Sequence, residues 1–302
     1  MRIRIERILM GAAALILAAA TAVAGRRGDH PRVFIDGDEP ERCSDVRVTF
    51  EDEPAFRAED RVTIPAGGAL RLEAAENSGV YVREASRPDF EVVLCKAAST
   101  ESGLSAIALS RSGDKVSVTG PTGGNWVGFL LVIAPRGASL EISAFNGPIG
   151  LHGLSGRVIA RTENGPISAS GSTGELDLEA ENGPIHFEGD SGRSKLRTQN
   201  GPIGVRLDGR SWEGEGLDAR AVNGPVSVWI PPGYGSAALV ESAGRSPFSC
   251  RGSGCAAARK SWNDDGRRIE VGEGPVLVRV ATVNGPVSIR TGSGAGGDED
   301  ED

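Results

Sequence analysis

The sequence predicts an all-β fold: a single-domain parallel β-solenoid with about 18 residues per coil, capped at both ends. The first observation behind this prediction is composition. Glycine (43 residues) and proline (17) are frequent and aromatic residues make up only 5% of 302 residues, which is typical of short strands joined by turns. The second is that apolar and polar residues alternate in many short segments. The third is a four-residue motif that recurs at a fixed interval.

The recurring motif is Asn-Gly-Pro followed by Ile or Val. Successive copies among the first four are 18 residues apart, and two further copies follow at wider spacing. The asparagines of the six copies are Asn146, Asn164, Asn182, Asn200, Asn223 and Asn284. Alternate residues on both sides of the motif are apolar or small, as in strands with one buried face. We therefore expect strand, corner, strand, corner in each repeat, with Asn-Gly turning through positive φ and proline where no N–H is needed.

Two arrangements accommodate this pattern. Antiparallel hairpins also use Asn-Gly turns, whereas a solenoid stacks each repeat ~4.8 Å above the previous one. Outward positions are basic in residues 157–161, acidic in 175–179 and basic again in 193–197. Stacking in register places opposite charges side by side, which favours the solenoid. The stacked asparagines then form a structural ladder of hydrogen-bonded amides.

The N-terminal residues 1–24 have the pattern of a signal peptide. Three arginines precede an apolar run, and small residues follow at Ala22 and Ala24, as in a cleaved segment. An uncleaved anchor is the alternative, but the apolar run is short for ~30 Å of hydrocarbon. We therefore expect an exported protein, periplasmic or on the cell surface, that does not span the membrane after cleavage.

The rest of the chain is expected to form one capped stack, because a bare solenoid end would template aggregation. The expected parts are a lead-in and cap at 25–60, degenerate opening β-coils at 61–135, regular Asn-Gly-Pro coils at 136–292 with a Cys-bearing insertion at 245–268, and a disordered Gly-rich acidic tail at 293–302. In this scheme the coil over residues 276–289 closes the stack.

Four cysteines in an exported chain indicate disulfides, with three pairings open to them. Cys250 and Cys255 enclose a four-residue loop that could close on itself, which would leave Cys43 to pair with Cys95. The spacings do not resemble zinc sites, and nothing in the acidic tail would hold the oxygen cage of a calcium ion. We expect structural cysteines and neither a metal nor another cofactor.

A strand-rich N-terminal part, an apolar strand ending Val132-Ile133-Ala134-Pro135 and coils carrying Asn-Gly-Pro-Ile together resemble the bacterial putative-adhesin family, whose members are exported β-solenoid domains of unknown function. The resemblance covers residues 60–292. It implies an extracytoplasmic β-helical fold and a role in the envelope or at the surface. It implies no enzyme activity and offers no catalytic residues to carry over. This chain departs from the family pattern in its Cys-bearing insertion and its acidic tail.

The sequence offers few candidate catalytic or ligand-binding residues. Stacking would place Ser168 beside His186, with Glu188 two residues along, a set that resembles a catalytic triad. All three would stand on an exposed strand, without a strained turn or helix end to form an oxyanion hole, so we expect no enzyme activity. Exposed aromatic side chains are platforms for sugars, and Trp229 and Trp262 are the candidate ligand contacts.

The net charge of −8 argues against a nucleic-acid partner. The sequence predicts a non-catalytic exported β-solenoid, an adhesin-like structural or interaction protein of the bacterial cell envelope. Its charge-striped face would meet an envelope protein, a glycan or another copy of itself. The alternative is a carbohydrate-active or carbohydrate-binding β-helix. An accessory role in envelope stress or signalling is a third hypothesis.

Overall fold

The computed structural model describes residues 32–35, 40–51, 53–123, 125–243, 246–263 and 266–292. The expected signal peptide and acidic tail lie outside these residues. Within them the protein is all-β, with two large sheets, one small sheet and few helices. The helical elements are a 3-10 turn at Cys43–Asp45, α1 (Glu101–Ser105) and α2 (Ser253–Ala257).

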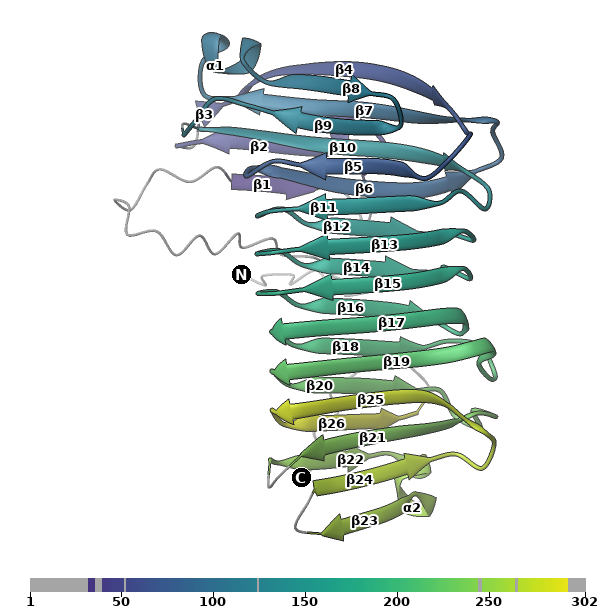
Figure 1. Cartoon of the computed structure of the whole chain (residues 1–302). Coiled ribbons are helices and arrows are strands. Elements are labelled where there is room, and N and C mark those ends of the chain that lie inside the picture. The colour runs from purple at the N-terminus through teal and green to yellow at the C-terminus, as the bar shows by residue number, and fades with distance from the viewer. Residues whose placement is uncertain are drawn as a thin grey trace, which may run out of the picture.

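Two large sheets face each other along the stack (Figure 1). In spatial order, sheet 1 consists of β23 (Arg259–Asn263), β24 (Gly266–Val271), β21 (Ala237–Ala243), β25 (Val276–Asn284), β19 (Glu213–Asn223), β17 (Ser191–Asn200), β15 (Glu175–Ala180), β13 (Arg157–Thr162), β11 (Leu140–Ala144), β5 (Leu70–Ala74), β9 (Lys115–Thr119) and β8 (Ala108–Ser112). Sheet 2 consists of β22 (Phe248–Arg251), β26 (Val287–Thr291), β20 (Val226–Ile230), β18 (Ile203–Leu207), β16 (Ile185–Gly189), β14 (Ile167–Ser170), β12 (Ile149–His152), β6 (Ser78–Ala85), β10 (Trp126–Pro135), β7 (Asp89–Ala98) and β4 (Phe56–Pro65).

Each 18-residue repeat contributes one strand to each sheet, and we call such a pair of strands a layer. β13 pairs in parallel with β11 and β15, and β14 pairs in parallel with β12 and β16. Residues 18 positions apart are therefore direct neighbours: Val158 lies beside Leu176, and Ile167 beside Ile185. Their side chains point between the sheets and are fully buried. Burial of each such side chain contributes about 1.5–3 kcal/mol, so every layer adds its own share of the core.

The glycines of the motif let consecutive layers approach closely at the corner. A Cβ added to Gly165 would lie 2.3 Å from the carbonyl oxygen of Gly147, and one added to Gly183 would lie 2.1 Å from that of Gly165. The expectation of positive φ at Asn-Gly was wrong: none of the six Asn-Gly-Pro glycines, all within the described ranges, has a positive φ. Positive φ occurs instead at the opposite corner, at Gly153 and Gly171. Glycine is needed in the motif because a side chain would collide with the layer beside it.

The layers do not stack in chain order at the C-terminal end. β25 lies between β19 and β21, and β26 lies between β20 and β22. The coil expected to close the stack is therefore inserted one position earlier, and β21 to β24 form the end (Figure 1). The reason lies in the corner: Asn284 donates a hydrogen bond to Asn223, whereas residues 237–243 carry no Asn-Gly-Pro motif to continue that contact.

Antiparallel strands build much of the two ends, so both large sheets are mixed. In residues 61–135, where opening coils were expected, β5 and β6 continue the parallel layers, but β7 pairs antiparallel with β4 and β10 and β8 pairs antiparallel with β9. At the other end β24 pairs antiparallel with β21 and β23. Alternation of apolar residues alone does not distinguish the two directions, which is why the parallel prediction was wrong for these strands.

A small N-terminal sheet covers the outer face of sheet 2 near its β4 end. It consists of β1 (Arg32–Ile35), β2 (Val46–Phe50) and β3 (Glu53–Pro54). Val46, Val48 and Phe50 form a second hydrophobic cluster with Val127 and Phe129. The cluster contains no residue of β12 to β26, but Pro40 and Glu41 of the N-terminal segment line a small hollow together with Gly150, His152, Ser168 and Ser170.

The corner packing predicts the cost of a single methyl group. Gly183→Ala should lower the free energy of unfolding by about 2–3 kcal/mol, because the new Cβ cannot fit beside the Gly165 carbonyl oxygen. Gly67→Ala is the matched control, since no atom lies within 4 Å of its new Cβ, and it should change stability by less than about 0.5 kcal/mol. Urea unfolding measures both. Equal stability of the two variants would contradict the packing argument.

The inserted layer predicts the effect of removing residues 274–302. Without β25 and β26, β21 and β22 lose their parallel neighbours, so amide hydrogen exchange in residues 237–251 should become fast. Protection in residues 140–200 should remain, because those layers keep both neighbours. A chain that ends after Gly292 is the control and should behave as the full chain. If residues 237–251 stayed protected in the shorter variant, β21 and β22 would not depend on β25 and β26. That result would contradict the position of β25 and β26 inside the stack.

Candidate functional site

The asparagines of the motif form a continuous ladder at one edge of the stack. In each step the side-chain amide nitrogen donates to the amide oxygen of the preceding asparagine, at 3.1 Å from Asn164 to Asn146, 3.1 Å from Asn182 to Asn164 and 2.9 Å from Asn200 to Asn182. The ladder continues at 3.0 Å from Asn223 to Asn200 and at 2.9 Å from Asn284 to Asn223. These six side chains are engaged with one another, which makes the motif a structural element of the stack.

Two disulfides hold the ends of the molecule. Cys43 is bonded to Cys95, with 5.2 Å between their Cα atoms, and this bond joins the 3-10 turn of the N-terminal segment to β7. Cys250 is bonded to Cys255, with 5.6 Å between Cα atoms, and closes the short loop between β22 and α2. All four cysteines are paired, in the pairing that the sequence suggested.

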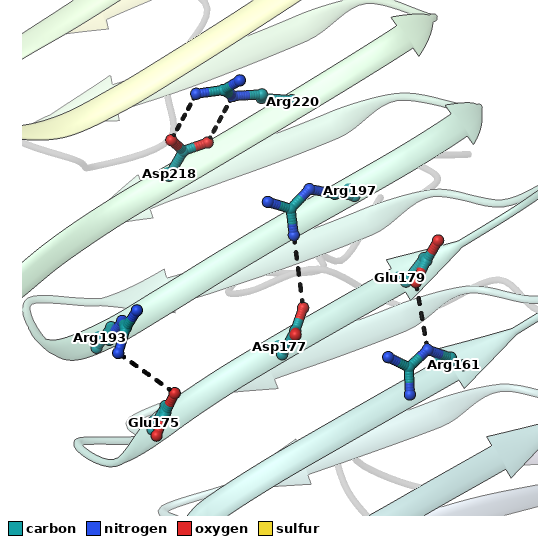
Figure 2. Close-up of polar contacts among 8 residues, drawn as sticks. All are labelled: Arg161, Glu175, Asp177, Glu179, Arg193, Arg197, Asp218 and Arg220. Atoms are coloured by element: carbon teal, nitrogen blue, oxygen red, sulfur yellow. Dashed lines mark hydrogen bonds and ion pairs between the residues drawn. The ribbon is translucent and has the colours of Figure 1, made fainter.

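The outer face of sheet 1 carries rows of alternating charge. Glu175 lies between Arg157 and Arg193, with nitrogen–oxygen distances of 3.5 Å to each. Arg161 lies 3.3 Å from Glu179, and Arg197 lies 3.7 Å from Asp177 (Figure 2). These groups are about half-exposed, so each pair contributes only ~0.2–1 kcal/mol. The long paired side chains nevertheless cover the strands beneath them.

In the column of Arg161, Glu179 and Arg197, this alternation ends at β19. Arg220 is the register partner of Arg197, so the two strands present like charges at that position. Arg220 turns back along its own strand and donates two hydrogen bonds to Asp218, at 2.8 and 2.9 Å (Figure 2). β25 offers Ala281 beside Arg220, so no acidic partner crosses from the next strand at this position. The charge alternation is therefore interrupted in this column, whereas Lys195, Asp218 and Arg279 continue it in the neighbouring one.

The outer face of sheet 2 is built differently. From β12 to β26 each strand directs two side chains outward, and one of the two columns is mostly small. In spatial order this small column consists of Gly150, Ser168, His186, Gly204, Ser227 and Ser288. The second column consists of His152, Ser170, Glu188, Arg206, Trp229 and Arg290. A shallow depression of about 490 Å³ runs over the strands from β14 to β26.

The residues that suggested a triad lie on this face but do not form one. Ser168 and His186 are register partners, yet within the described part of the chain no hydrogen bond joins their side chains. Glu188 makes an ion pair with Arg206 at 3.6 Å. Packing against the sheet removes part of the hydration of His186 and lowers the pKa of its imidazole. The described contacts therefore do not join Ser168, His186 and Glu188 into a triad; on the same face, Oγ of Ser170 lies 3.1 Å from Nδ1 of His152.

The two candidate tryptophans lie at separate places. Trp229 stands in the depression of sheet 2, with the guanidinium carbon of Arg206 at 4.7 Å from its ring centroid. Trp262 is 52% exposed and meets Phe248 edge-on at 5.5 Å between centroids, joining the last strands of the two sheets. Trp126 and Trp212 are buried and donate their indole N–H to backbone carbonyl oxygens. Of the two candidates, Trp229 alone lies on the open face.

Sequence reasoning missed the small column on sheet 2. Its signal was present, because every outward position two residues after the motif proline is Gly, Ser or His. At Gly204 a larger residue would crowd the neighbouring side chain, because a Cβ there would come to 3.0 Å from Nδ1 of His186. Among the described residues, no group of three or more His, Cys, Asp or Glu side chains is placed to hold a metal ion. The helices of the described ranges include none that is long and apolar enough to cross a membrane.

No protein-family model and no curated protein matches the sequence. Among solved structures, a putative cell adhesion protein from Clostridium sporogenes aligns at 10% identity and a TM-score of 0.30, over 78% of this chain and 100% of its own. A putative adhesin from Bacteroides fragilis aligns at 8% identity and a TM-score of 0.23, over 78% and 97%. A putative lipid binding protein from Parabacteroides distasonis aligns at 8% identity and a TM-score of 0.31, over 77% and 96%. TM-scores this low do not establish a shared fold.

The ladder predicts different effects for the same substitution at two asparagines. Asn182→Asp should lower the free energy of unfolding at neutral pH by about 1 kcal/mol, because a carboxylate cannot donate to the amide oxygen of Asn164. Asn146→Asp is the control: its side-chain oxygen still accepts from Asn164, and no further asparagine precedes it in the ladder. It should cost less than half as much. Thermal unfolding measures both, and equal costs would show that the amide donors contribute nothing.

Proposed function

We propose that this protein is an exported, single-domain β-solenoid of the bacterial cell envelope, and that it works without catalysis as an adhesin-like interaction protein. In-register parallel layers over residues 140–230 support the solenoid. The signal-peptide pattern of residues 1–24 supports export. The two disulfides support it independently, since such bonds persist in oxidising compartments.

The observation that carries the proposal is the open outer face of sheet 2. Ser168, Gly204, Ser227 and Ser288, with His186 between the first two, keep one column of this face low, whereas on sheet 1 long ion-paired side chains occupy neighbouring outward columns. A low strip that repeats layer by layer suits an extended partner better than a small molecule. We infer that the partner lies along this strip, across the strands.

Absence of catalysis is part of the same proposal. Catalysis by an activated nucleophile would require a base within hydrogen-bond reach of that nucleophile and a third group to orient the base. Beside the strip, Glu188 is held by Arg206, and His186 is not joined to Ser168 within the described residues; the serine–histidine contact that the described residues do make is that of Ser170 with Nδ1 of His152, at 3.1 Å. These contacts suit a recognition surface of polar and charged side chains.

Carbohydrate binding is the second candidate function. Trp229 is the aromatic side chain on the strip, and its neighbours Arg206, Ser227 and Ser288 offer hydrogen-bond donors beside the ring. An indole face flanked by polar groups is a common arrangement for binding amphipathic ligands. In this second function the partner on the strip is a glycan. In the first function the partner is an envelope protein or a second copy of this chain.

The test is a binding measurement with envelope extract and immobilised protein. Ser227→Arg places a long side chain on the strip and should reduce specific capture by about tenfold, while Ser143→Arg, on the outer face of sheet 1, should leave it unchanged. Equal capture by both variants would contradict the proposed surface. Trp229→Ala separates the candidates, since it should abolish binding to glycans on an array if the partner is a sugar. Release of reducing or unsaturated ends from a polysaccharide, lost in His186→Ala, would overturn the non-catalytic proposal.

A further inference from the structure

A hollow interrupts the outer face of sheet 1 where the inserted layer lies. β25 places Ala281 between Arg220 of β19 and Glu241 of β21. One methyl group thus stands between two long side chains. The result is a hollow of about 510 Å³ whose floor is formed by β19, β25 and β21 and whose far side is formed by β24 and β23. Sites for small ligands typically have ~300–1,000 Å³, so its size admits one or two sugar rings.

The hollow is basic although the chain as a whole is acidic. Its lining includes four arginines, Arg220, Arg267, Arg268 and Arg279, and two acidic residues, Asp218 and Glu241. Both acids are already paired: Asp218 accepts from Arg220, and Glu241 lies 2.6 Å from Arg268. The hollow therefore has two more positive than negative charges, in a protein with a net charge of −8.

Arg279 is the residue with unused donors. Its side chain is exposed, and it makes no hydrogen bond or ion pair with any residue in the described ranges. Its register neighbours are Asp218, which is engaged by Arg220, and Leu239. A guanidinium group presents donors in a planar fork that matches a carboxylate, and such bidentate pairs are strong and directional.

We propose that this hollow binds the carboxylate groups of an acidic polysaccharide, with Arg279 as the anchoring side chain. Arg267 adds the second positive charge that no acidic side chain of the hollow pairs with, since its described contacts are the carbonyl oxygen of Ser246 and the ring of Trp262. Ser261 and Asn263 line the same hollow and supply a hydroxyl and an amide for sugar hydroxyl groups. Val283, which is 48% exposed, supplies an apolar contact for the face of a sugar ring. This site lies on sheet 1 and is independent of the strip on sheet 2.

A polysaccharide fits better than an acidic peptide. Extended peptides bind sheets by adding a strand at an open edge, where backbone groups are unpaired. The strands that floor the hollow, β19, β25 and β21, are each paired on both sides. No open edge lies within that floor, so recognition there must come from side chains.

The experiment uses the full chain and three soluble probes: polygalacturonate, the same polymer as its methyl ester, and polyglutamate. Titration calorimetry at low salt should show binding of polygalacturonate and none of the neutral ester. Arg279→Gln should weaken binding of polygalacturonate by roughly tenfold or more, since a hydrogen-bonded charge pair is lost. Ala281→Phe should do the same by filling the hollow without changing the charge.

Arg136→Gln is the matched control, because it removes one exposed positive charge in the turn between β10 and β11 and should leave affinity unchanged. Equal effects of Arg136→Gln and Arg279→Gln, or binding of polyglutamate as tight as that of polygalacturonate, would overturn the proposal. Binding lost in Trp229→Ala and retained in Arg279→Gln would overturn it too, and would place the polymer on sheet 2.

Discussion

Close contact between layers at the Asn-Gly-Pro corner is the constraint on which the stack depends. The glycine allows the backbone of one layer to reach the carbonyl oxygen of the layer beside it, at a distance that excludes any side chain. The asparagine next to it then comes within hydrogen-bond distance of its counterpart. Because both contacts repeat from layer to layer, they hold the register in which Ile167 meets Ile185 and Arg161 meets Glu179. Core and surface pairing both follow from the corner.

The regular part of the fold was predictable because a fixed period carries register information. An 18-residue repeat specifies which residues are neighbours, so the repeat alone was enough to place the amide ladder and the charge rows at Glu175 to Glu179. The disulfide pairing followed from a short loop that could close on itself. The ends lacked this periodic signal, and alternation of apolar residues does not reveal whether strands run parallel or antiparallel.

The order of the last layers was missed for a different reason. The expectation assumed that position in the chain equals position in the stack, although the motif itself indicated otherwise. Asn223 and Asn284 both belong to Asn-Gly-Pro copies, and residues 237–243 lie between them without one. Since a ladder joins only adjacent asparagines, those two layers had to be neighbours. The hollow beside Ala281 was missed for the same reason, because it forms only when β25 lies between β19 and β21.

The two large sheets share a core but present opposite kinds of surface. Sheet 1 covers its strands with arginine and carboxylate side chains, while sheet 2 has mostly serine and glycine in one of its two outward columns. One sequence repeat produces both, because alternate strands of each layer face away from each other. Variation along one column can therefore change one surface without affecting the other. This separation is what would allow a single scaffold to carry the two binding surfaces proposed above.

The out-of-order layer also sets the sequence of events during assembly. Residues 237–251 leave the ribosome before residues 276–291, yet they occupy the place beyond them in the stack. The growing chain must therefore hold a vacancy between two finished segments, or leave the outer segment undocked, until its final stretch arrives. In the finished arrangement, a chain without residues 276–291 would leave the facing edges of β19 and β21, and of β20 and β22, without their strand partners.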